Sequence, residues 1–509
     1  MDIDDLLNYI NEEGEEDKKK KKKKSKKKSK QQLEDSEKIK IPEIENVISK
    51  NEEKSEISKI PLNENSNQNK AQKKKHKKEY IPKYANTDSE NNSITEKTPF
   101  RENPYREIIN KEILEEEKKE ISKSSYQDNS KFRLIGNWEE KETNQTIPIT
   151  KSIDEQYECL SEFPEGIIME YVSENIWRSN SEEKKELEKY ILYTITSMRK
   201  AGECHRQIRK YAQRIIKPGI KLIEMCKKIE NMLKFITNAN LTECGQAFPT
   251  GCSLNNIAAH YTPNSGDETI LKENDVMKLD FGTQINGYII DCAFTVAFNP
   301  IYDNLLKASK EATNEGIKLS GIDARLCEIG GAIEEVIKSY EIELNGKYHK
   351  IKPIKDLCGH TLGRFRVHGN KSVPLFKNEE NTMKMEEGEL YAIETFATTG
   401  KGKCKELREW SHFMKDPLAF NNTKIKASQP KNMFKFIDEH FSTMAFCPRW
   451  LEEGGLTNVD KSLKYLCDIG VVEPYPPLAD VEGSFTSQFE HSFILRPTCK
   501  EIFSIGDDF

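Results

Sequence analysis

A predicted β-hairpin within residues 276–298 places the strongest constraint on how this chain can fold. Its sequence, VMKLDFGTQINGYIIDCAFTVAF, consists of two runs rich in β-branched and apolar residues on either side of Asn286-Gly287. An Asn-Gly pair between two such runs is the sequence signal of a type I′ hairpin turn. We therefore expect two long antiparallel strands that are joined by a two-residue turn.

The turn fixes the register and brings two carboxylates together. With Asn286-Gly287 as the turn, Gly282 lies opposite Asp291, and Asp280 shares a face with Gly282 because side chains alternate along a strand. The two aspartates are then diagonal neighbours, roughly 7–8 Å apart at the backbone. The residues that flank them are apolar, which favours burial over exposure at a sheet edge. Two buried acids repel each other unless a cation or a proton separates them, so the hairpin predicts a metal site.

Other potential ligands lie in similarly apolar segments. Glu394 lies in GELYAIETFA, Glu490 in SFTSQFEHSFIL and His360 in LCGHTLGRF, and a buried unpaired Glu is energetically costly. A single His is more often structural than a ligand, but four acids and one His offer the donors of a two-ion site, and two divalent ions would neutralise the four carboxylates. None of the 12 cysteines forms a CxxC pair, so a zinc knuckle is not indicated.

The charge of the chain is divided between two unlike parts. Residues 1–130 carry 30 Lys plus Arg and 29 Asp plus Glu, with no Cys or Trp, whereas the rest carries 49 and 56. A segment so charged and so poor in apolar residues cannot offset its ordering entropy, and we predict a disordered tail with at most a short helix around residues 108–121. Its lysine blocks at 18–30 and 73–78 are either a solvated tail or an arm that docks on polyanions such as RNA or the ribosome.

Residues 131–509 are predicted to form one domain of the α+β class. Helical spacing indicates helices over 183–216 and 220–236, β-rich segments follow Phe248, and helical spacing returns in an insertion at about 410–475. The chain has no apolar run long enough to span a membrane and no secretory signal at its start, so we expect a cytoplasmic protein whose cysteines are free thiols.

Several long segments resemble the methionine aminopeptidases of type 2. They are GCSLNNIAAHYTPN, KLDFGTQINGYIIDCAFTVAFNP, GHTLGRFRVHG, EEGELYAIETFATTGKG, SHFMKD, VVEPYPPL and SQFEHSFILRPTCKE, and the resemblance extends from about residue 173 to the C-terminus. It implies the pita-bread (creatinase/aminopeptidase) fold, two pseudo-symmetric halves around a dinuclear metal centre. The helical insertion and the cysteine-free lysine-block tail favour type 2 over type 1.

The resemblance also assigns roles to individual residues. It implies metal ligands at Asp280, Asp291, His360, Glu394 and Glu490, with Asp291 and Glu490 shared by the two ions. Glu394 would also be the general base, and His260 and His368 would steady the peptide carbonyl and the tetrahedral intermediate. The residues that resemble the methionine pocket are Phe248, Val367, His412 and Tyr475.

The implied activity is removal of the initiator methionine from nascent proteins whose second residue is small. The implied cofactors are two divalent ions (Co, Mn, Zn or Fe), the substrate is the N-terminus of a nascent peptide, and the enzyme is a monomer whose tail contacts the ribosome or a translation factor. One alternative is an inactive pita-bread binding protein, and another is a prolidase or Xaa-Pro aminopeptidase. Trp410, which stands where a small residue is common in this family, is expected to alter the rim of the pocket.

Overall fold

The computed structural model describes residues 149–157, 163–418 and 425–509, all within the second of two compact units, Thr98–Phe509. The predicted tail of residues 1–130 and its short helix lie outside the described residues. No helix in the described part of the chain is long and apolar enough to cross a membrane. The eleven cysteines in these ranges are all free thiols, as expected.

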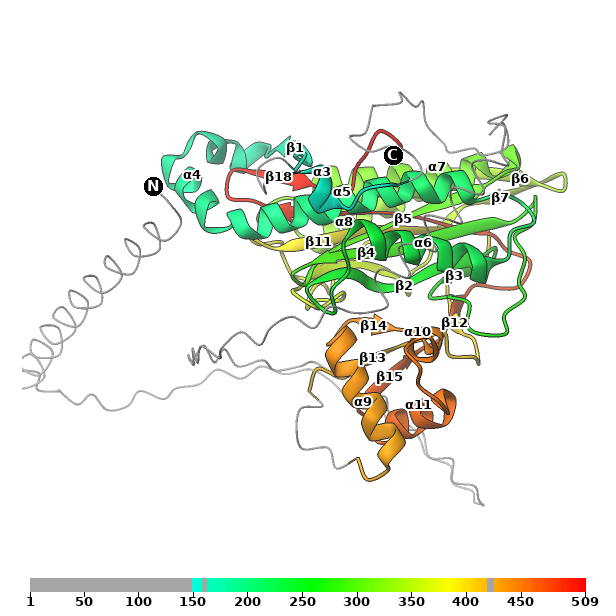
Figure 1. The fold of residues 1–509 in the computed structure, drawn as a ribbon. Coiled ribbons are helices and arrows are strands. Elements are labelled where there is room, and N and C mark those ends of the chain that lie inside the picture. Colours follow the sequence, from blue (N-terminus) through cyan, green and yellow to red (C-terminus); the bar gives the residue numbers. More distant parts are fainter. Residues whose placement is uncertain (1–148, 158–162, 419–424) are drawn as a thin grey trace, which may run out of the picture. The chain divides into compact units, whose positions relative to one another are not determined.

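The first half of the domain is a three-stranded antiparallel sheet covered by two long helices (Figure 1). Its strands, in the order β2-β4-β5, are β2 (Cys244–Leu254), β4 (Val276–Ile285) and β5 (Tyr288–Ala297). The helices α5 (Leu192–Ile215) and α6 (Leu222–Ile236) pack on this sheet through mostly apolar faces that also bury charged residues, among them Arg209 on α5 and Glu230 on α6. The predicted helix over 183–216 is in fact two helices, because the backbone leaves the helical conformation at Ile191, where α4 (Glu182–Tyr190) ends.

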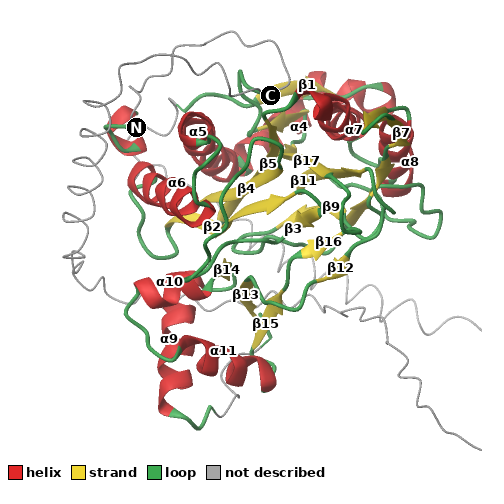
Figure 2. Cartoon of the chain, turned by 90° about the vertical axis from the view of Figure 1, so that its right-hand side faces the viewer, coloured by secondary structure: helices red, strands yellow, loops and turns green. Residues whose placement is uncertain are grey.

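The second half repeats this plan with a larger sheet and another helix pair. The strands follow the order β1-β18-β17-β11-β9-β10, and β8 (Lys352–Pro353) pairs with the end of β11. The bounds are β1 (Ile167–Glu170), β9 (Cys358–Leu362), β10 (Ser372–Pro374), β11 (Leu390–Thr398), β17 (Thr486–Leu495) and β18 (Cys499–Ile502). Helices α7 (Asp303–Leu319) and α8 (Leu326–Lys338) pack against it, so each half presents a sheet inward and helices outward (Figure 2).

The insertion contains strands that the helical spacing did not reveal. Helices α9 (Ser428–Phe441), α10 (Pro448–Glu453) and α11 (Val459–Asp468) surround an apolar cluster of their own. Between and around these helices in the sequence lie the strands β13 (His412–Lys415), β14 (Ala445–Phe446) and β15 (Val472–Tyr475), which together form a three-stranded sheet. These strands are two to four residues long, too short to produce a period-two pattern in the sequence.

Short elements complete the described part. They are α3 (Ile153–Gln156), η2 (Ser173–Asn180), β3 (Ile257–Ala259), η3 (Pro300–Tyr302), β6 (Glu341–Leu344), β7 (Lys347–Lys350), β12 (Lys405–Glu406) and β16 (Leu478–Ala479). Strands β12, β16 and β3 form a small sheet, and β6 and β7 form a hairpin.

The predicted Asn286-Gly287 turn is present, and its glycine cannot be replaced without cost. Gly287 has φ +80°, and a Cβ atom there would lie 2.6 Å from the ring of Phe365. An L-residue in the left-handed conformation costs about 1–2 kcal/mol. We expect Gly287→Ala to lower the free energy of unfolding by more than this amount, as measured by urea denaturation.

The matched control is Gly346→Ala in the β6–β7 turn. Gly346 has φ +71°, but a Cβ atom there would meet nothing within 4 Å, so only the backbone cost applies. Equal losses of stability in the two variants would show that the contact with Phe365 has no energetic weight.

Candidate metal centre and substrate pocket

The β4–β5 hairpin has the register that the sequence predicted. Gly282 pairs with Asp291 and Asp280 pairs with Ala293, so the two aspartates are diagonal neighbours on one face. Asp291 is buried, with 4% of its surface exposed. The apolar residues around them hold this face against the second sheet.

The second sheet supplies the other three predicted ligands from two strand pairs. In the β11–β17 pair, Glu394 lies directly opposite Glu490. In the β9–β11 pair, His360 lies opposite Ala392, which puts His360 on the face of Glu394, one diagonal step away. The sequence identified these residues individually but gave no indication that the two glutamates are direct cross-strand partners.

Side-chain hydrogen bonds rather than a strand ladder join the two halves. The Ser492 hydroxyl accepts a bond from the Asp291 backbone N–H (2.8 Å) and donates one to the Asp291 carbonyl (2.6 Å). Four residues away on both strands, the Thr295 hydroxyl does the same with the backbone of Gln488, at 2.8 and 2.7 Å. These paired bonds fix β5 against β17 and so hold the Asp291 and Glu490 carboxylates next to each other.

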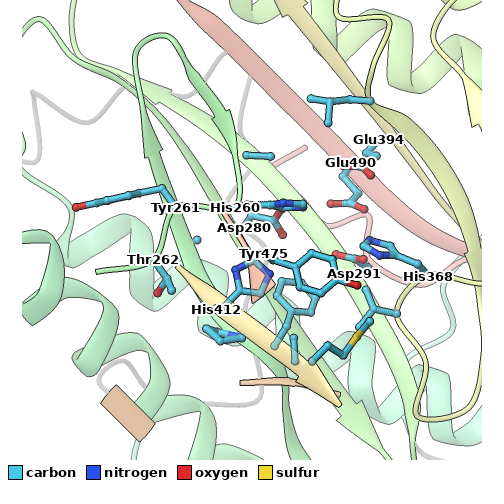
Figure 3. Close-up of a pocket in the computed structure, with 18 of the residues that line it drawn as sticks. His260, Tyr261, Thr262, Asp280, Asp291, His368, Glu394, His412, Tyr475 and Glu490 are labelled. Carbon is cyan, nitrogen blue, oxygen red and sulfur yellow. The ribbon is translucent and has the colours of Figure 1, made fainter. Parts of the chain in front are cut away.

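The four acidic side chains point into one small space (Figure 3), and His360 lines the same pocket. His360 Nε2 lies 3.6 Å from Asp291 Oδ2 and also 3.6 Å from Glu394 Oε1. One ligand atom each from Asp291, His360 and Glu490 lie within 4.8 Å of one another, close enough to hold one ion. Asp280 approaches the same space from β4, beside Asp291.

Burial and mutual repulsion make the carboxylates difficult to ionise. Burial, and then the neighbouring acids, raise the pKa values of Asp291, Glu394 and Glu490 well above the usual range, and burial raises the pKa of Asp280 to about 7. Within the described part of the chain, Asp280 Oδ1 and both Glu490 oxygens have no hydrogen-bond partner. Buried oxygens of this kind are expected to be satisfied by another group. Divalent cations fit this donor set, since carboxylate and imidazole ligands bind Mn, Fe, Co or Zn.

One residue of the centre was missed in the sequence. The Gln488 amide donates one hydrogen bond to Asp280 Oδ2 (3.1 Å) and another to Glu394 Oε2 (3.2 Å), so it connects an acid of one half to an acid of the other. Gln488 is two residues before Glu490 on β17 and therefore shares its face. That period-two spacing is the signal that could have identified it.

A pocket opens directly onto the carboxylates, and all the predicted substrate residues line it. They are His260, His368, Phe248, Val367, His412 and Tyr475. The pocket is also lined by Met414, Ala445, Leu357 and Phe396, which the sequence analysis did not single out. Trp410 is not among the lining residues. It is 42% exposed and packs edge-on against Phe413, which gives no support to the expected effect on the rim.

The histidines of the pocket are positioned by contacts with other aromatic rings and, for His260, by an unusual backbone conformation. His260 follows β3 with φ +69°, a left-handed conformation that is unusual for a residue other than glycine and often marks a functional position. Its ring lies edge-on to His412, with centroids 5.2 Å apart, and His412 stacks on Tyr475 at 5.3 Å. His368 lies edge-on to His360, with centroids 4.4 Å apart. Burial lowers the pKa of His260 and of His368 to about 4.

The fold and the buried carboxylate centre define the class of this protein. Residues 196–416 match the sequence profile of Metallopeptidase family M24. The solved structure of a thermophilic Arx1 is similar with a TM-score of 0.52 and 18% identity over 60% of this chain and 88% of that chain, a likeness of fold alone. The chain has the pita-bread fold that its sequence resemblance implied, and it is a metallopeptidase.

Three relatives with similar sequences show to which group of metallopeptidases the chain belongs. The chain is 52% identical to methionine aminopeptidase 2A of Arabidopsis thaliana, covering 68% of this chain and 78% of the relative. It is 47% identical to methionine aminopeptidase 2 of Schizosaccharomyces pombe, covering 72% of this chain and 85% of the relative. The same identity holds for methionine aminopeptidase 2 of Dictyostelium discoideum, with 72% and 81% covered. The chain therefore belongs to the methionine aminopeptidase 2 group of the M24 family.

Metal binding is predicted to stabilise the protein more as the pH rises. The Asp280 carboxyl has a pKa of about 7 in the folded chain against about 4 when unfolded. In the metal-free protein, the Asp280 carboxyl therefore lowers the free energy of unfolding as the pH rises from about 4 to about 7. Above about pH 7 this decrease is complete. A cation bound to the ionised acids removes the loss, so the Tm gained on adding Mn²⁺ should be larger at pH 8 than at pH 5.

Thermal unfolding with and without Mn²⁺ across this pH range measures the effect. The control is Asp303→Asn, which removes a partly buried acid at the start of α7, and it should leave the metal-dependent gain unchanged. A gain that does not vary with pH would contradict a site made of acids with raised pKa values.

Proposed function

We propose that this chain removes methionine from the N-termini of peptides whose second residue is small, with two divalent ions held by Asp280, Asp291, His360, Glu394 and Glu490. The observation that carries the proposal is that four carboxylates, two of them buried and two partly buried, line one pocket together with apolar and aromatic side chains. Four carboxylates require two divalent cations to balance their charge, whereas one ion would leave two excess negative charges in a buried site. When bound, the ions would supply Lewis acidity that activates water and polarises the peptide carbonyl.

The protein's own side chains would move the protons and hold the substrate. Glu394 is in position to accept a proton from the attacking water and to return it to the nitrogen of the departing peptide as the C–N bond breaks. His260 and His368 project into the same pocket, where their ring N–H groups can donate hydrogen bonds to the carbonyl oxygen as it gains charge. Both rings are neutral at physiological pH, so each retains one donor and one acceptor nitrogen.

The rest of the pocket fits a flexible, apolar side chain. Phe248 and Val367 offer apolar surface, while the stacked pair His412 and Tyr475 forms a flat aromatic wall. Met414 adds a polarisable thioether to the same surface. A methionine side chain suits such a slot, because sulfur makes favourable contacts with aromatic rings.

The proposal extends to the charged tail and to the setting in which the enzyme works. A monomer in the cytoplasm, with its lysine blocks on ribosomal RNA, would meet nascent chains as they emerge. Clustered lysines bind RNA by releasing counterions, so the association should weaken steeply with salt. Co-sedimentation with ribosomes that is the same with and without residues 1–130 would contradict this assignment.

The activity is tested by release of free methionine from Met-Ala-Ser by Mn²⁺-loaded protein. We expect release from Met-Ala-Ser and none from an Xaa-Pro dipeptide. Preferred cleavage before proline would favour the prolidase alternative. Full metal loading without release from either substrate would favour the inactive binding protein.

The role of His260 is tested by His260→Ala. Removing one donor to the developing oxyanion typically costs on the order of 100-fold or more in kcat. We expect a loss of this size with unchanged metal content and Tm. The matched control is His349→Ala in the β6–β7 hairpin, away from the pocket, which should retain full activity. Wild-type kinetics in His260→Ala would refute the role.

A further inference from the structure

A buried ion pair outside the metal centre joins the insertion to the first half of the domain. Arg449 on α10 forms a two-pronged contact with Glu230 on α6, with Nη1–Oε2 at 2.5 Å and Nη2–Oε1 at 2.9 Å. Both side chains are 1% exposed. Trp450 Nε1 donates a further bond to Glu230 Oε2 (2.8 Å). Because the planar guanidinium makes two parallel hydrogen bonds to the carboxylate, the contact fixes the orientation of α10 relative to α6 as well as the distance between them.

The same arginine also holds the segment that follows His260. Arg449 Nε donates to the carbonyl of Pro263 (3.1 Å), and the Arg449 backbone N–H donates to Asn264 Oδ1 (3.3 Å). The Asn264 amide in turn donates to the carbonyl of Ser411, which immediately precedes β13 (2.9 Å). The Thr262 N–H donates to the Ser411 hydroxyl (2.7 Å), so this segment and β13 are tied together.

Glu230 also contacts β2, a strand that lines part of the pocket. Its Oε1 accepts a bond from the Thr250 N–H (3.3 Å) on β2, the strand that contributes Phe248 and Gly251 to the lining. The pair thus lies behind the junction of three segments: β2, the residues after His260, and the insertion. The insertion brings four lining residues to the pocket, His412, Met414, Ala445 and Tyr475.

Stability alone does not account for such a pair. The insertion has its own apolar cluster, which includes Phe413, Ile437, Phe446 and Leu463. Well-packed apolar residues in place of a buried ion pair are often as stabilising or more so, because the charges lose their hydration on burial. An apolar contact is not directional, whereas the two-pronged contact fixes the relative orientation of the two side chains.

We propose that Glu230 and Arg449 are positioning residues that set the distance between the insertion and β2, and thereby the selectivity of the pocket for the methionine side chain. This inference rests on the proposed function. Neither side chain lines the pocket, so the effect passes through the segments that they hold. Without this ion pair, the lining residues of the insertion could shift relative to β2. The pocket should then accept side chains of other shapes and bind methionine more weakly.

The test compares two double variants, each of which replaces one ion pair by two methionines. Glu230→Met with Arg449→Met removes the buried charges together and keeps apolar volume. The matched control, Lys435→Met with Glu439→Met, removes an exposed ion pair on α9 of the same insertion (3.3 Å). The measurements are kcat and KM for Met-Ala-Ser and Leu-Ala-Ser with Mn²⁺-loaded protein.

In the buried-pair variant we expect KM for Met-Ala-Ser to rise about tenfold while kcat stays within about threefold. The preference for Met over Leu, measured as the ratio of kcat/KM values, should fall about tenfold. This is the size of effect that a change in the shape of an apolar pocket has on substrate discrimination. The control should match the wild type. A folded buried-pair variant with wild-type selectivity, or one that loses kcat with KM and selectivity unchanged, would overturn the inference.

A second variant covers the case in which the double variant does not fold. Arg449→Lys keeps the charge but loses the two-pronged contact, and the same shift in KM and selectivity is expected from it. Wild-type parameters in folded Arg449→Lys would overturn the inference. An inactive, metal-loaded wild-type protein would instead refute the proposed function, so the two failures are distinguishable.

Discussion

The repulsion among four clustered carboxylates is the constraint on which the rest of this structure depends. Asp280 and Asp291 come from one strand pair, Glu394 and Glu490 from another, and each pair alone would be an unfavourable arrangement of like charges. Together with His360 they form a donor set that becomes favourable once divalent cations are bound. The architecture of two similar halves can be understood as a way to present two acids from each side.

The supporting contacts follow from that constraint. Acids that repel each other stay in place only if their backbones are held, and the Ser492 and Thr295 hydroxyls hold β5 against β17 with bonds that no ladder supplies. Gln488 then connects Asp280 to Glu394 across the two halves. The insertion closes the pocket from a third side, and the buried Glu230–Arg449 contact joins it to α6.

The sequence predicted the local parts of this site better than the long-range ones. The register of the β4–β5 hairpin followed from Asn286-Gly287, because a two-residue turn leaves only one pairing. The pairing of Glu394 with Glu490 joins strands that are separated by the whole insertion, and no local pattern encodes it. The break at Ile191 was missed because the apolar stripe continues through it. The family resemblance supplied the pocket residues, which spacing alone could not have gathered.

The number of divalent ions that the folded chain binds tests the central claim most directly. Native mass spectrometry of metal-free protein titrated with Mn²⁺ near pH 7.5 should show two ions bound per chain. Glu490→Gln, which removes one charge from the centre of the four carboxylates, should leave at most one ion. A wild-type chain that binds no Mn²⁺ under these conditions, or a Glu490→Gln chain that still binds two with unchanged affinity, would contradict a metal centre built on these acids.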